Sequence, residues 1–194
     1  MTTRFIDVSV TGGVISFDVA SGMTQRSWID ALDILFASPQ IAENLLNNPA
    51  RVTLSKFALV ANGPNIASTS VSVPFGGAAS LTRTGNNLRL NFGSGVIGNS
   101  GRNSIAADGY YRLDLDFEGD GAVDTTKYFY RQLGDVNGDR KVDSGDVSLV
   151  QAGMAKPYNR ELDINGDTLV NGLDRYWTQA AVGRRLRTDL FLND

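Results

Sequence analysis

Short runs in which hydrophobic and polar residues alternate fill the chain up to residue 131. In residues 110–117, for example, Tyr111, Leu113 and Leu115 fall on one side and polar residues lie between them. A period of two places alternate side chains on opposite faces of a β-strand. Turn-forming glycine, asparagine and proline separate the runs. The pattern predicts about eight or nine strands, within residues 4–10, 14–20, 31–37, 51–60, 67–75, 81–92, 110–117 and 122–130.

Two hairpins and one helix can be placed in this region. Residues 81–92 form one predicted hairpin around Gly85 and Asn86, and residues 110–130 form another around residues 118–121. Residues 41–48 predict a short helix between two prolines. A series of short strands joined by turns favours an antiparallel β-sandwich over residues 1–132, with a strand order that the sequence leaves open.

Beyond residue 132 the pattern changes to two similar units with an offset of 28 residues. Each unit is a polar loop, beginning at Asp135 or Asp163, followed by apolar residues at steps of three and four that are typical of a helix. The expected apolar stripes contain Val147, Val150 and Met154 in the first helix, and Tyr176 or Trp177, Ala180 and Ala181 in the second. A small helical module over residues 133–194 is therefore predicted. Because no Pro- or Ser-rich linker precedes it, we expect it to pack against the sandwich.

Composition narrows the chemistry open to this chain. Its 194 residues include no cysteine and no histidine, which excludes disulfides, thiolate ligands and the Ser-His-Asp triad. Of the 21 acidic residues, only Glu43, Glu118 and Glu161 are glutamates. Residues 1–107 carry a net charge of +2 and residues 108–194 a net charge of −5. Because aspartate favours turns over helix interiors, the acidic half predicts loops built from short carboxylates, and its charge argues against a nucleic-acid partner.

Each polar loop has the spacing of an EF-hand-type calcium loop. Counted from its first Asp, it places oxygen-bearing side chains at positions 1, 3, 5, 9 and 12, and position 7 contributes a backbone carbonyl. The first loop supplies, in that order with position 7 included, Asp135, Asn137, Asp139, Lys141, Asp143 and Asp146. The second supplies Asp163, Asn165, Asp167, Leu169, Asn171 and Asp174. Clustered carboxylates repel one another unless a cation lies among them, and calcium accepts a flexible shell of about 6–8 oxygens, whereas magnesium requires a tighter octahedron. The sequence therefore predicts two calcium ions.

Two further loop positions carry expectations of their own. Position 6 usually holds glycine, but it is Arg140 in the first loop and Thr168 in the second. We therefore expect backbone strain from positive φ angles and a weakened calcium affinity. Position 8 holds Val142 and Val170, which we expect to pair in a short β contact between the loops.

A third stretch, residues 116–127, follows the same template only in part. Asp116, Glu118, Asp120 and Asp124 occupy positions 1, 3, 5 and 9, but a lysine stands at position 12. A turn at the tip of the predicted hairpin accounts for these residues, and we favour it over a third calcium site.

The duplicated segments GDVNGDRKVDSGD and DINGDTLVNGLD, each followed by one helix, resemble a type I dockerin over residues 133–194. The resemblance implies a calcium-dependent fold with pseudo-twofold symmetry, and docking to a cohesin-like domain of another protein. Positions that dockerins often use for recognition hold Ser144, Gly145, Gln151 and Ala152 in the first copy, and Gly172, Leu173, Gln179 and Ala180 in the second. Residues 1–132 resemble the immunoglobulin-like repeats of bacterial secreted and surface proteins, through LTRTGNNLRLNF and DGYYRLDLDF.

These observations predict a non-catalytic module for calcium-dependent protein attachment, or for stabilising a larger extracellular or cell-surface protein. No pair of carboxylates stands out for glycoside hydrolysis, so we do not expect an enzyme. The alternative is a carbohydrate-binding appendage of a polysaccharide-degrading protein. In that case a platform of aromatic residues would stack on sugar, namely Trp28, Trp177, Tyr110, Tyr111, Tyr128 and Tyr130. The start of the chain lacks a secretory signal, which suggests a piece of a longer secreted chain, and no apolar run suits membrane insertion.

Overall fold

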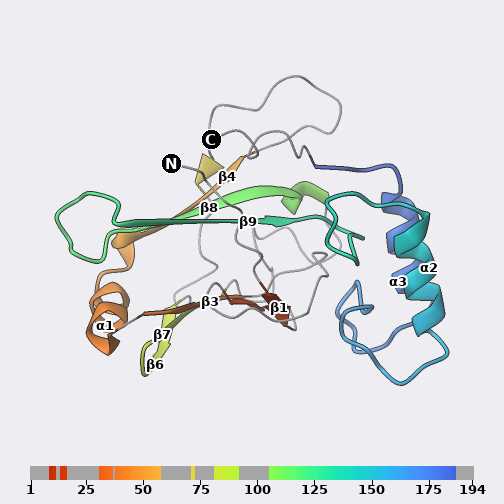
Figure 1. Cartoon of the computed structure of the whole chain (residues 1–194), viewed down its shortest axis with the longest axis horizontal. Coiled ribbons are helices and arrows are strands. Elements are labelled where there is room, and N and C mark those ends of the chain that lie inside the picture. The colour runs from red at the N-terminus through yellow and green to blue at the C-terminus, as the bar shows by residue number, and fades with distance from the viewer. Residues whose placement is uncertain are drawn as a thin grey trace.

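The computed structural model describes residues 9–11, 14–16, 31–36, 38–57, 71–72, 81–91 and 105–186. Within these residues, two β-sheets face each other and two helices lie together beyond one end of the sheets (Figure 1). The first sheet has the order β1-β2-β3-β7-β6, which are Ser9–Thr11, Val14–Ser16, Ala31–Leu35, Asn87–Asn91 and Leu81–Thr84. The second has the order β5-β4-β8-β9, which are Val71–Ser72, Val52–Phe57, Gly109–Leu115 and Thr125–Arg131.

The hydrophobic core lies between the two sheets. It takes alternate residues from both: Leu32, Ile34, Leu88 and Leu90 from the first sheet, and Val52, Leu54, Tyr111, Leu113, Leu115 and Phe129 from the second. The rings of Tyr111 and Phe129 stack with their centroids 5.2 Å apart. The apolar side of β8 is thus buried, as its alternation predicts, while Arg112 and Asp114 on its other side are partly exposed.

Both predicted hairpins are confirmed, but one strand pair departs from the antiparallel expectation. β6 pairs antiparallel with β7, and β8 with β9. β2 and β3 run parallel, with Val14 opposite Ala31. A parallel pair needs a crossover connection of about a dozen residues or more, and residues 17–30 provide that length. The sandwich is therefore mixed, and the expectation of a purely antiparallel sandwich is wrong at this pair.

One helix, α1 (Pro39–Asn47), lies at the end of the sheets away from the two C-terminal helices (Figure 1). The Ser38 side chain caps it by accepting a hydrogen bond from the backbone N–H of Gln40 at 3.2 Å. Ala42 and Leu45 are buried in the sandwich core. The predicted short helix is confirmed and closes one end of the core.

Two short 3-10 helices, Pro49–Arg51 and Ile105–Ala107, precede β4 and β8. In the part of the chain that the structure describes, no helix has the length and apolar character needed to cross a membrane.

The C-terminal segment, residues 133–186, contains α2 (Ser144–Gly153) and α3 (Gly172–Ala181), which pack on each other. Its small core is made of Leu133, Val136, Val150 and Ile164, with Leu162, Val170 and Trp177 around them. Val150 and Ala181 are buried as the predicted stripes require. Of the alternatives Tyr176 and Trp177, Trp177 packs on the core and Tyr176 is exposed. Met154 and Ala180 are exposed, so each stripe is narrower than expected.

The junction between the sandwich and the C-terminal segment is buried, because every residue from 129 to 136 is shielded from solvent. Leu186, at the far end of the segment, packs against Tyr110 and Tyr130 of the sandwich. The Gln132 side chain donates a hydrogen bond to the carbonyl of Arg184 at 3.0 Å. These contacts agree with the expectation that no flexible linker separates the two parts.

An ion cluster also crosses this junction. Asp108, which precedes β8, pairs with Arg131 at 2.5 Å and with Arg184 at 2.8 Å. Its carboxylate also accepts a hydrogen bond from the backbone N–H of Leu133 at 2.9 Å. One buried carboxylate therefore contacts the last residue of β9 and both ends of the C-terminal segment.

Candidate metal centre

Each polar loop runs directly into a helix, and positions 9 and 12 form the cap of that helix. In the first loop, Asp143 is the N-cap of α2, and its backbone N–H donates to the Asp146 carboxylate at 2.9 Å. In the second, Asn171 is the N-cap of α3 and donates to Asp174 at 2.8 Å. Such a reciprocal capping box satisfies backbone donors that a helix leaves unpaired. Position 12 therefore lies in the first turn of the helix, as the template predicts.

The carboxylate at position 12 also closes the loop onto its own beginning. Asp146 accepts hydrogen bonds from the backbone N–H groups of Val136 and Asn137 at 2.9 and 3.3 Å. Asp174 accepts the equivalent bonds from Ile164 and Asn165 at 2.7 and 3.2 Å. Both aspartates are fully buried. The two ends of each loop are thus held together by one side chain.

The carboxylate at position 1 is held by the backbone of positions 4 and 6. Asp135 accepts from the N–H groups of Gly138 at 2.7 Å and Arg140 at 3.0 Å. In the second loop Asp163 accepts from Gly166 at 2.7 Å and from position 6 at 2.9 Å. The loops therefore share one frame of hydrogen bonds, residue for residue, and the repeat seen in the sequence is a structural repeat.

The side chains at positions 3, 5 and 7 make similar contacts in the two loops at two of these positions. The Asn137 amide donates to Asp139 at 3.1 Å, and the Asn165 amide donates to Asp167 at 2.9 Å. The side chains of Lys141 and Leu169 at position 7 are exposed, which leaves their backbone carbonyls as the atoms for a metal. The ammonium of Lys141 pairs with the carboxylates at positions 5 and 9, at 3.4 and 3.0 Å.

Backbone strain occurs at position 6, where the sequence predicts it. Arg140 has φ 69° and Thr168 has φ 71°, and within the described residues they are the non-glycine residues in the left-handed region. This region costs about 1–2 kcal/mol for residues other than glycine. The guanidinium of Arg140 lies 5.5 Å from the centre of the Tyr130 ring, a cation–π contact that offsets part of the cost in the first loop.

Replacing Thr168 with glycine is therefore expected to stabilise the protein by about 0.5–1 kcal/mol, after the extra flexibility of glycine in the unfolded chain is deducted. Arg140→Gly is expected to gain less, because it also removes the contact with Tyr130. Urea unfolding of both variants at fixed calcium measures the difference. A destabilised Thr168→Gly protein would show that the left-handed backbone is not strained.

The electrostatics of the loops fit a bound cation. Burial raises the pKa of Asp135 to about 7, and the backbone N–H groups of Arg140 and Gly138 oppose that shift. Burial likewise raises the pKa of Asp174. A buried carboxylate whose ionised form is disfavoured gains most from a divalent cation beside it. Among the described residues no three carboxylates converge enough to form a metal site alone, so a cation here also needs the amide and backbone carbonyl oxygens.

The third stretch forms the tip of the β8–β9 hairpin, as predicted. Asp116 accepts from the N–H groups of Gly119 at 2.5 Å and Gly121 at 3.1 Å. Asp124 accepts from the N–H of Glu118 at 2.9 Å. Asp116 thus repeats the hydrogen bonds that hold position 1 in the two loops. The stretch has Lys127 in place of the carboxylate that closes those loops at position 12, so we still favour a turn over a third calcium site.

The expected β contact between Val142 and Val170 is wrong. The backbone of Val142 donates to the carbonyl of Arg184 at 2.8 Å and accepts from the N–H of Gly183 at 2.9 Å. Lys141 bridges Arg185 in the same antiparallel arrangement. Because α3 ends at residue 181, the chain after it returns to the first loop and takes the place that Val170 was expected to fill.

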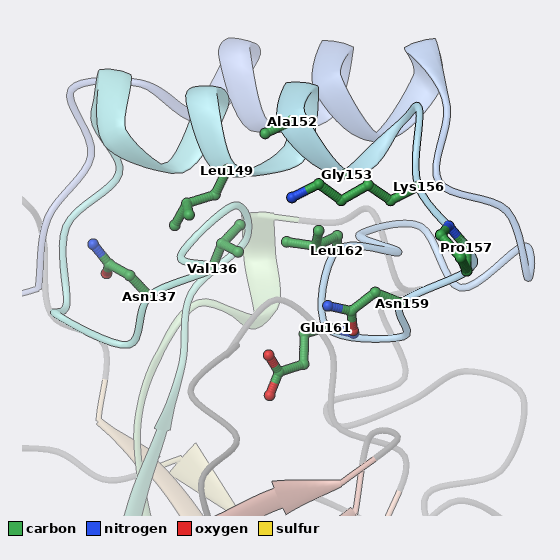
Figure 2. Close-up of a pocket in the computed structure, with 10 residues that line it drawn as sticks. All are labelled: Val136, Asn137, Leu149, Ala152, Gly153, Lys156, Pro157, Asn159, Glu161 and Leu162. Atoms are coloured by element: carbon green, nitrogen blue, oxygen red, sulfur yellow. The ribbon is translucent and has the colours of Figure 1, made fainter.

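A groove of about 470 Å³ lies beneath α2 (Figure 2). Figure 2 shows Leu149 of α2 directed toward Val136 of the first loop, with Leu162 beside it. A Cβ on Gly153 would lie 2.3 Å from a methyl group of Leu162, so a larger residue there would require the Leu162 side chain to move. The groove is lined by apolar residues such as Leu149 and Leu162, together with polar residues that include Lys156 and Glu161.

Sequence reasoning missed one residue in each copy. The single hydroxyl proton of Tyr130 is shared between the carbonyl of Gly138 at 2.7 Å and the Asp135 carboxylate at 3.1 Å. The hydroxyl of Tyr158 donates to the Asp163 carboxylate at 2.9 Å. Both tyrosines precede the first Asp of their loop by five positions, so the repeat extends further upstream than its loops indicate.

Two acidic loops with one hydrogen-bond frame, each continuing into a capped helix, define a duplicated loop-and-helix module. Comparison with known families agrees: residues 133–181 match the dockerin type I domain. The chain therefore contains a type I dockerin module, and the resemblance noted in the sequence is confirmed for these residues. Dockerin modules bind calcium, are non-catalytic and attach proteins to cohesins in general. No curated protein and no solved structure matched the chain.

Proposed function

We propose that the dockerin module binds two calcium ions, one in each loop. The ligands in the first loop are Asp135, Asn137, Asp139, the carbonyl of Lys141, Asp143 and Asp146. Those in the second are Asp163, Asn165, Asp167, the carbonyl of Leu169, Asn171 and Asp174. The observation that carries this proposal is the shared frame of backbone hydrogen bonds that holds positions 1 and 12 in both loops. Calcium when bound supplies a fixed positive charge that holds the loop, and no chemistry on a substrate.

The module then serves as an attachment site for a cohesin-like domain. The expected recognition residues Ser144 and Gln151 on α2, and Leu173 and Gln179 on α3, are all exposed and so available to a partner. The second copy also exposes the ring of Tyr176, which meets Trp177 edge to face. The two copies differ at the recognition positions, where Ser144 and Gly145 of the first correspond to Gly172 and Leu173 of the second. This difference favours a single mode of docking over two interchangeable ones.

We further propose that residues 1–132 are an immunoglobulin-like domain carried by the dockerin module over residues 133–194, as part of a protein that acts outside the cell or at its surface. The two facing sheets and the buried junction support this division. The parallel β2–β3 pair departs from the purely antiparallel pairing that we expected of such a domain.

The carbohydrate-binding alternative loses most of the residues that suggested it. Tyr110 and Tyr111 are fully buried. Tyr130 packs with Leu186 at the junction, and Trp177 packs on the small core of the C-terminal segment. Trp28, and the side chain of Tyr128, lie outside the described residues. The four members of this set that the structure describes do not form an exposed platform, which favours protein attachment over sugar binding.

Binding to a panel of immobilised type I cohesin modules, with calcium or with a chelator, tests the proposed function. We expect the full chain to be retained in millimolar calcium and released by chelator. Leu173→Asp places a charge on the exposed face of α3 and is expected to weaken retention at least tenfold. The matched variant Ser148→Asp on α2 is expected to weaken retention less. Equal retention with and without chelator would contradict calcium-dependent attachment.

Calorimetric titration of the full chain tests the ions separately from the partner. Two equivalents of calcium are expected. If the chain took up no calcium at millimolar concentration, the site assignment would be contradicted, whatever the cohesin panel shows.

A further inference from the structure

Each calcium loop is preceded by a tyrosine whose hydroxyl points at the first-position carboxylate. The Tyr130 hydroxyl shares its proton between the Asp135 carboxylate at 3.1 Å and the carbonyl of Gly138, in the same loop, at 2.7 Å. The Tyr158 hydroxyl donates to Asp163 at 2.9 Å. The separation between the two tyrosines equals the 28-residue offset of the loops. The contact therefore occurs at the same position of each repeat. The same carboxylates also accept from the loop backbone, which leaves their orientation fixed from two sides.

We infer that Tyr130 and Tyr158 are positioning residues that hold the first ligand of each calcium loop in its binding orientation. This inference rests on the proposed function. Groups that orient metal ligands typically change metal affinity by about 10–100-fold when they are removed. A hydroxyl that donates to a carboxylate fixes the side chain without competing for the cation, because it carries no positive charge.

The two copies differ in what holds the tyrosine itself. Tyr130 belongs to β9 and is only 4% exposed, with Tyr110 at 6.1 Å between ring centres and Leu186 packed against both. Tyr158 lies in the connection between α2 and α3 and is 50% exposed. The first calcium loop is therefore oriented by the last strand of the sandwich, whereas the second is oriented from within the dockerin module.

This asymmetry links the first ion to the sandwich. A displacement of β9 at Tyr130 moves the hydroxyl that orients Asp135, and the Arg140 side chain stacked over the same ring moves with it. Disturbance of the sandwich leaves Tyr158 and Asp163 in place. The calcium affinity of the first loop thus depends on the neighbouring sandwich, whereas that of the second loop does not.

Two single-hydroxyl variants of the full chain, Tyr130→Phe and Tyr158→Phe, test the inference. The backbone N–H signals of Gly138 and Gly166 in two-dimensional NMR spectra report the two loops separately during a calcium titration. We expect Tyr130→Phe to raise the calcium dissociation constant of the first loop about tenfold and to change that of the second less than twofold. Tyr158→Phe is expected to do the reverse.

Tyr111→Phe is the matched control, since it removes a buried hydroxyl that donates to the carbonyl of Ala107 on the sandwich side. It is expected to lower sandwich stability and leave both calcium constants unchanged. Phe variants that leave both constants within twofold of the native protein, or shift both loops alike, overturn the inference while the two ions stay bound. A native chain that takes up no calcium overturns the proposed function instead. Tyr158 is half-exposed, so its variant gives an answer even where Tyr130→Phe does not fold.

Discussion

Asp146→Ala is expected to destabilise the C-terminal segment by about 3 kcal/mol without calcium, and to abolish calcium binding in the first loop. One fully buried carboxylate accepts from the backbone N–H groups of Val136, Asn137 and Asp143, and forms the capping box of α2. Each buried donor left without a partner costs about 1–3 kcal/mol. Urea unfolding in chelator measures the first effect, and calorimetric titration measures the second.

Asp146→Asn separates the two roles of this side chain. The amide oxygen still accepts from Val136 and Asn137, so most of the stability in chelator is expected to remain, with a loss of about 1 kcal/mol from the bond to Asp143. The lost charge is expected to reduce the rise in melting temperature that calcium gives, because that rise follows the occupancy of the site. An alanine variant that keeps the full calcium-induced rise would contradict the assignment of Asp146 as a ligand.

Arg131→Met is expected to destabilise the whole chain by about 3 kcal/mol. Arg131 is fully buried and pairs with Asp108 at 2.5 Å, so its removal leaves a buried carboxylate with less compensation. Burial raises the pKa of Asp108 and lowers that of Arg131, which shows how strongly the surroundings oppose both charges. Equilibrium unfolding in urea measures the loss.

The double variant Asp108→Asn with Arg131→Met removes both charges and is expected to recover more than half of that loss. Arg112→Met is the matched surface control, because Arg112 pairs with Asp114 at 2.8 Å on the partly exposed side of β8. It is expected to change stability by less than about 1 kcal/mol. Equal losses from Arg131→Met and Arg112→Met would contradict a special cost of breaking the buried pair.

Features that depend on residues close in sequence were predictable from the chain alone. The loop positions from Asp135 to Asp146 were readable because every candidate ligand lies within one turn-rich stretch, and the strain at Thr168 followed from the same template. The hairpin around Gly85 was readable because alternation and turn chemistry act locally.

Features that join distant residues were not predictable in this way. The parallel pairing of β2 with β3 depends on the course of a long connection. The return of residues 183–186 to Val142 displaced the expected contact with Val170, since a repeat in sequence says nothing about the chain that follows it. The tyrosine before each loop was overlooked because Tyr130 also reads as a strand residue, and only the second copy at Tyr158 shows that the spacing is part of the repeat.

The continuous burial of residues 129–136 has a mechanical consequence. The final strand, β9, passes straight into the first loop of the dockerin module, with no exposed hinge between them. Tension applied through the two C-terminal helices would pass along β9 into the sheet. The sandwich and the dockerin module would therefore keep a fixed relative orientation. The junction would then fail by loss of the strand pairing of β9, and not by bending.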